Sequence, residues 1–215
     1  MKYFVSAIVL LFGSIVVHSQ AAYPDPEFSN EVYLYRKDSA DKLLRLEKGS
    51  SKMENKTKMG GFGGSESAYI MDGGKSSVRL VSSKDLSFIF FNGSSARSSS
   101  PQYDSMMRAN GADPAMMQNM EAMMDPSNTI GLYQAVCDKE QRKILIQKTP
   151  GAMPFGSKKT KSSDKFTFSV KKIRAGYWQL VVDKTLPKGE YIFSVVNMGM
   201  GNMDGSNLLF AFAID

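Results

Sequence analysis

The sequence predicts an all-β protein, an antiparallel β-sandwich of roughly ten strands that carries one short Met-rich helical insertion. Short runs of residues alternate apolar and polar side chains, which is typical of strands with one buried face. Clusters of turn-forming residues separate these runs at intervals of roughly 8 to 12 residues, as in sandwiches. One segment, residues 94–126, breaks the series with serines and methionines. These three observations set the fold class and locate the insertion.

The expected strands follow one another along the chain after residue 30. In order, they cover residues 31–35, 43–47, 68–72, 77–82, 86–91, 129–137, 142–148, 165–173, 177–183, 190–197 and 207–214. Alternation is explicit in the last third, where three sets of apolar side chains each share one face: Phe166 with Phe168 and Val170, Trp178 with Leu180 and Val182, and Phe210 with Phe212 and Ile214. Trp178 is therefore predicted to face the core and not to stack on a sugar.

An N-terminal signal peptide is predicted over residues 1–21. Lys2 precedes an uncharged run of 14 residues, and small residues follow that run. A membrane-spanning helix needs about 20 apolar residues, so the run is too short to stay as an anchor. Cleavage after Ser19 and cleavage after Ala21 both fit the pattern. We expect an exported protein, secreted or periplasmic in a bacterial cell envelope, with residues 22–215 as a single sandwich domain that is not transmembrane after cleavage.

A turn in the last third also supports a sandwich. The phrase Leu186-Pro187-Lys188-Gly189-Glu190-Tyr191 places Pro and Gly where a turn needs them and leads into an apolar run. Together with the chain end Phe-Ala-Ile-Asp, it resembles the C-terminal phrase of secreted bacterial β-sandwich proteins. The resemblance covers about 30 residues and implies a sandwich in an extracytoplasmic location, without carrying over any catalytic residue.

Few residues of the chain are suited to catalysis. The single histidine, His18, lies inside the predicted signal peptide, so the mature chain has no imidazole for acid–base work. The single thiol, Cys137, sits in an apolar run and is expected to be a small buried hydrophobe. Carboxylates are dispersed, and a pair such as Asp183 and Glu190 is the remaining option for an enzyme that acts on polysaccharide. We therefore predict a non-enzymatic protein without a cofactor.

Charge is distributed unevenly along the chain. The whole sequence has 27 Lys and Arg against 21 Asp and Glu, but residues 139–190 hold 13 basic and 4 acidic residues. Lys158, Lys159 and Lys161 form a cluster that would attract anionic polysaccharide or lipid head groups. No aromatic side chains interleave with these lysines, so a nucleic-acid partner is not expected. The alternative is that the lysines only protect strand edges from pairing with another chain.

The segment between Asp104 and Asp125 contains seven methionines. Asp113 followed by Pro114 predicts the start of a helix, and the step from Asp125 to Pro126 predicts its end. Five methionines share one face of that helix: Met116, Met117, Met120, Met123 and Met124. This face could fill gaps against the sandwich, belong to a disordered insertion, or meet an adaptable partner.

A soft-metal site is a further interpretation of the Met-rich helix. Thioethers are soft, neutral ligands, and Met116, Met120 and Met123 would reach one copper(I) or silver(I) ion from the same face. The main prediction is an exported, envelope-associated binding or structural module whose ligand the sequence leaves open. A Met-based copper(I) or silver(I) binding protein of the periplasm is the alternative.

Overall fold

The computed structural model has the all-β, sandwich-like architecture that the sequence predicts, with antiparallel sheets and short helices. The predicted signal peptide, the candidate ligands Met116, Met120 and Met123, and the lysines Lys158 and Lys159 lie outside the residues that it describes. The structure describes residues 23–37, 42–58, 63–82, 84, 86–93, 101–111, 113, 125–151, 160–196 and 206–215.

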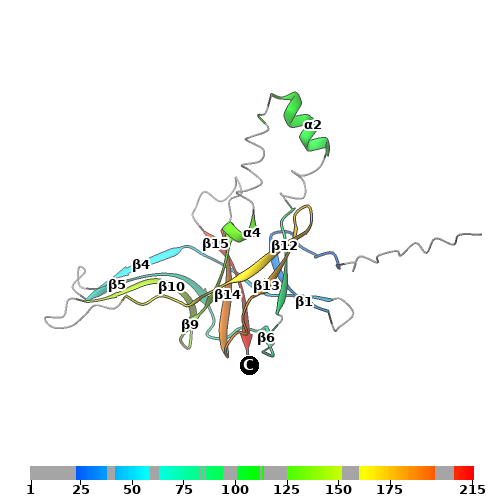
Figure 1. The fold of residues 1–215 in the computed structure, drawn as a ribbon. Helices are drawn as coiled ribbons and strands as arrows, with labels where there is room; N and C mark the ends of the chain where they lie inside the picture. The colour runs from blue at the N-terminus through cyan, green and yellow to red at the C-terminus, as the bar shows by residue number, and fades with distance from the viewer. Residues whose placement is uncertain are drawn as a thin grey trace, which may run out of the picture.

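Three sheets account for most strands of the described residues (Figure 1). Sheet A has the order β12-β13-β7-β1-β2, with the bounds β1 (Glu31–Arg36), β2 (Lys42–Arg45), β7 (Ser87–Phe91), β12 (Phe168–Arg174) and β13 (Tyr177–Val182). Sheet B has the order β11-β8-β14-β15-β3, with β6 parallel to β15, and the bounds β3 (Glu47–Ser51), β6 (Arg79–Leu80), β8 (Ile130–Gln134), β11 (Lys165–Phe166), β14 (Gly189–Val196) and β15 (Asn207–Ile214). Sheet C has the order β4-β5-β10-β9, with the bounds β4 (Met53–Thr57), β5 (Gly64–Asp72), β9 (Val136–Cys137) and β10 (Gln141–Pro150).

Sheets A and B enclose the main hydrophobic core between their facing sides. Phe88 of sheet A contacts Phe193 and Phe212 of sheet B, with ring centroids 4.9 and 5.1 Å away. The predicted inward faces are confirmed, because all of the following side chains are buried in this core or pack against it: Phe166, Phe168, Val170, Trp178, Leu180, Val182, Phe210, Phe212 and Ile214. The alternation of apolar side chains therefore identifies the core-facing sides of these strands correctly.

The predicted turn before β14 is fixed by a glycine and a tyrosine. Gly189 has a positive φ of 155°, and a Cβ at this position would come within 2.6 Å of the Gln134 side-chain nitrogen. The hydroxyl of the buried Tyr191 donates a hydrogen bond to the carbonyl oxygen of Pro187 at 2.7 Å. This hydrogen bond ties the entry of β14 to the turn that precedes it, in the manner of a tyrosine corner.

Three strands that the sequence predicts as continuous are each divided in two, because the chain passes from one sheet to another within them. The breaks fall at Leu46 between β2 and β3, at Ala135 between β8 and β9, and at Thr167 between β11 and β12. Strands that switch sheets in this way form the corners of sandwiches. The predicted burial of Cys137 is wrong for this reason: it lies beyond a corner, on the short edge strand β9, and is exposed.

Sheet C forms an arm beside the sandwich, and its three long strands, β4, β5 and β10, extend together away from sheets A and B (Figure 1). At the base of the arm, Met71 and Ile144 pack against Ile192, Leu209 and Ala211 of sheet B. Every residue of β4 is exposed, and this strand is not among those that the sequence predicts. A strand without a buried face shows no apolar alternation, which is why the pattern was absent.

The helices of the described residues are short. Helix α2 (Pro101–Ala109) contains Met106 and lies within the Ser- and Met-rich segment 94–126. Asp125, the predicted end of the Met-rich helix, caps helix α4 (Pro126–Thr129) by accepting a hydrogen bond from the Ser127 amide. Residues 114–124 of the predicted helix lie outside the described residues. Within the described part of the chain, no helix has the length and the hydropathy needed to cross a bilayer.

Candidate functional site

The side of the arm that points away from sheet B carries a row of charged residues. Tyr69 and Met71 of β5 face sheet B, so the even-numbered Glu66 on the same strand faces the other way. The strand register places Glu66 directly opposite Lys56 of β4 on one side and Lys148 of β10 on the other. Directly opposite residues share a face of a sheet, so the three side chains form a line across the strands.

Lys161 extends this row by one position. It forms an isolated antiparallel bridge with Lys148, in which each backbone amide donates to the other carbonyl oxygen at 2.8 and 3.0 Å. The row therefore reads Lys161, Lys148, Glu66, Lys56 from one edge of the arm to the other. We call these four residues the basic face.

A β-bulge in β10 brings two of its lysines to the same side of the arm. The register shifts between Leu145 and Gln147, which leaves Ile146 as an extra residue. Lys143 and Lys148 are five positions apart and would lie on opposite faces of a regular strand. The bulge turns both toward Glu66, with Lys–carboxylate distances of 3.9 and 2.9 Å.

The acidic residues near the basic face neutralise only part of its charge. The hydrogen bond from Lys148 lowers the pKa of Glu66 below its ordinary value, outweighing the opposite effect of partial burial. Lys56 pairs with Glu54 at 3.2 Å on the same strand, while Lys161 has no carboxylate partner among the described residues. The face therefore offers exposed ammonium donors to an anionic ligand.

The bridge between Lys161 and Lys148 places two positively charged residues directly opposite each other. Like charges directly opposite each other destabilise an antiparallel pair. Glu66 compensates the charge of Lys148. The segments that connect to this end of sheet C, residues 58–63 and 151–163, contain lysines and no Asp or Glu. Two ammonium groups from neighbouring chain segments are thus available to one anionic ligand.

Of the three predicted lysines, the structure describes Lys161 and places it in the basic face. Lys56 and Lys148 were missed, because they come from strands far away in the sequence and meet only through the register of β4, β5 and β10. The predicted methionine ligands are not among the described residues. Within the described ranges, no group of three or more His, Cys, Asp or Glu side chains could hold a metal ion.

The candidate carboxylate pair has separate structural partners. Glu190 accepts a hydrogen bond from the Ser76 amide at 2.8 Å and contacts Arg79 at 3.5 Å, whereas Asp183 accepts a hydrogen bond from the Ser169 hydroxyl at 2.7 Å. Both carboxylates are therefore engaged in contacts that hold loops and strand ends.

The exposed thiol of Cys137 is not activated as a nucleophile. Partial desolvation of the sulfur, and then the nearby Glu190 carboxylate, raise its pKa above the ordinary value. A reactive cysteine needs the opposite shift, because the thiolate is the attacking form.

Comparisons with known proteins give no relative from which a function could be transferred. The assignment of a site depends on the geometry of the described residues. No protein-family model matches this chain, and neither does any curated protein or solved structure.

Proposed function

We propose that this protein is an exported, non-enzymatic binding module that holds an anionic polysaccharide of the cell envelope on the basic face of its arm. The observation that carries the proposal is the directly opposed pair Lys148 and Lys161, in a row that also contains Lys56. Lysines that only protect a strand edge from pairing need not be placed against each other across a ladder. A polyanion laid along the row would relieve their repulsion.

The arrangement of the row favours a linear polymer over a lipid head group. Neighbouring strands are about 4.8 Å apart, so the lysines at the two ends of the row are separated by roughly 14 Å across the face. A polysaccharide with regularly spaced carboxylates can contact all three lysines at once. A single head group can contact only one or two of them.

Alginate, a linear polymer of uronic acids, is a suitable probe. The double variant Lys56→Gln/Lys161→Gln should bind immobilised alginate about 30-fold more weakly than the unmodified protein, because each lysine near an anionic surface contributes about 1 kcal/mol. Affinity of the unmodified protein should fall steeply as salt increases. The matched control Lys171→Gln/Lys184→Gln removes two exposed lysines from the sandwich and should bind as the unmodified protein does.

Two outcomes would overturn the proposal. Equal loss of affinity in both double variants would show a nonspecific attraction to the whole basic chain. Binding to vesicles of anionic phospholipid without binding to alginate would show that the partner is a lipid surface. Uncharged dextran should bind neither the unmodified protein nor the variants.

A further inference from the structure

An open groove of about 670 Å³ lies at one end of the sandwich, away from the basic face. It is lined by the last residues of β1, by β13, and by the chain on either side of the β6 to β7 connection. Volumes of this size are typical of small-molecule sites. No part of the proposed polysaccharide site contributes to its lining.

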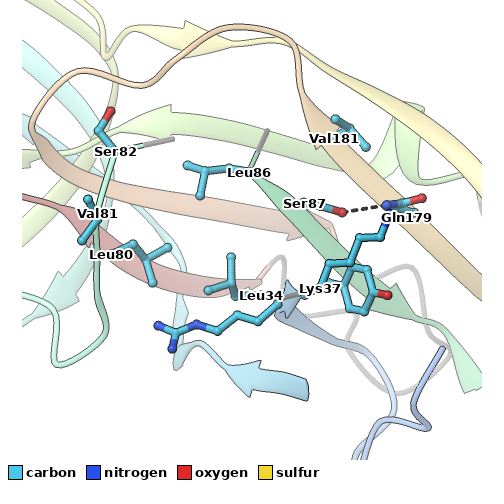
Figure 2. Close-up of a pocket in the computed structure, with 11 residues that line it drawn as sticks. Leu34, Lys37, Leu80, Val81, Ser82, Leu86, Ser87, Gln179 and Val181 are labelled. Carbon is cyan, nitrogen blue, oxygen red and sulfur yellow. Dashed lines mark hydrogen bonds between the residues drawn. The ribbon is translucent and has the colours of Figure 1, made fainter. Parts of the chain in front are cut away.

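The two sides of the groove differ in chemistry (Figure 2). Leu34, Leu80 and Leu86 gather on one side, where the groove borders the main core. Val81 stands beside them with 81% of its surface exposed, the largest exposed fraction among the large apolar side chains described. Lys37, Ser87 and Gln179 contribute polar groups to the lining.

Hydrogen bonds within the protein leave donors facing the polar side of the groove. The Tyr23 hydroxyl donates to the Gln179 side-chain oxygen at 3.1 Å, and the Gln179 nitrogen donates to the Ser87 hydroxyl oxygen at 2.8 Å. The hydroxyl hydrogen of Ser87 can therefore be donated to a ligand. Arg36 and Lys37 add two cations, and no carboxylate is among the described residues that line the groove.

We propose that this groove binds a long-chain fatty acid. Its carboxylate would accept hydrogen bonds from Lys37 and Ser87. Its alkyl chain would cover the exposed Val81 and lie against the edges of Leu34, Leu80 and Leu86, which are 4–7% exposed. Charge-assisted hydrogen bonds to the head group and burial of apolar surface along the chain supply the two parts of the affinity. The site is independent of the proposed polysaccharide-binding function.

A dansyl-labelled undecanoic acid tests this site through the rise in dansyl fluorescence on transfer to an apolar environment. The protein without its predicted signal peptide should bind the probe. Palmitate should displace the bound probe, whereas the uncharged hexadecanol should not. Lys37→Glu should weaken binding about tenfold or more, as loss of a hydrogen bond to a charged group predicts. Ser87→Phe should abolish binding by filling the groove.

The arm provides the matched control. Lys161→Gln should leave probe affinity unchanged. Fatty-acid binding in the groove and polysaccharide binding on the basic face can therefore be tested separately. Probe affinity that is equal in Lys37→Glu and in the unmodified protein would overturn the proposal, as would equal displacement by palmitate and hexadecanol. Because Lys37 is exposed, its variant stays informative even if Ser87→Phe does not fold.

Discussion

The sandwich and the arm use the same antiparallel pairing, but they differ in the interactions that hold them in place. Between sheets A and B, aromatic side chains such as Phe88, Phe193 and Phe212 fill a core from which water is excluded. The arm contacts the sandwich through a small apolar cluster at its base, and every residue of its edge strand β4 is exposed.

An ion pair between the buried Arg142 and the partly exposed Glu47 secures the base of the arm instead of a large core. The fully buried guanidinium of Arg142 forms hydrogen bonds with both carboxylate oxygens of Glu47 and with the carbonyl oxygens of Asp72 and Gly73. Glu47 belongs to sheet B and Arg142 to sheet C, so the pair joins the two sheets. The large core lies in the sandwich, so the arm can carry like charges without loss of the main stabilising interactions.

The largest expected effect is a difference in the free energy of unfolding between a variant of the sandwich core and a variant of the arm. Phe193→Ala should lower the free energy of unfolding by about 3–5 kcal/mol, because it opens a cavity beside Phe88 and Phe212. Met53→Ala on the exposed strand β4 should change it by no more than about 0.5 kcal/mol. Urea denaturation of both variants measures the difference. Similar losses in the two variants would contradict the division of roles.

A smaller and more local effect is expected at the base of the arm. Arg142→Met should cost about 2–3 kcal/mol, because it leaves the Glu47 carboxylate and two carbonyl oxygens without their donor. Amide hydrogen exchange should increase in β5 and β10 before it increases in β7 and β13. A uniform increase over both regions would show that Arg142 stabilises the whole protein and not the arm.

The same ion pair makes the arm sensitive to acid. Burial raises the pKa of Glu47, but hydrogen bonds from Arg142, the Ser77 amide and Ser76 outweigh it and hold the pKa below the ordinary value of 4.5. The contribution of Glu47 is therefore complete above about pH 4.5 and is lost as pH falls through the folded-state pKa. Arg142→Met removes the largest of these hydrogen bonds, so stability of the variant should depend less on pH in that acidic range.

The core could be predicted from the sequence because the pattern that indicates it lies within single strands. Trp178, Leu180 and Val182 alternate along one strand, and burial of that face follows from the pattern alone. Corners are not visible in such a pattern, since Leu46 and Ala135 look like ordinary members of the runs that contain them. The wrong expectation for Cys137 has this cause.

The basic face could be predicted only in part because its residues come from segments that are far apart in the sequence. Lys161 was found as a member of a lysine cluster, but its neighbours Lys148 and Lys56 are brought to it by strand register and by one bulge. An extra residue in β10 decides which way Lys148 points, and neither composition nor periodicity records such a shift.

The smallest change is also the most direct test of the proposed function. Lys161→Gln should weaken alginate binding about fivefold, while the free energy of unfolding stays the same or rises by up to about 0.5 kcal/mol, since a repulsion with Lys148 is removed. Both quantities can be measured on one sample, by calorimetric titration and by urea denaturation. Loss of stability with unchanged affinity would show that Lys161 serves the fold of the arm and would contradict the account.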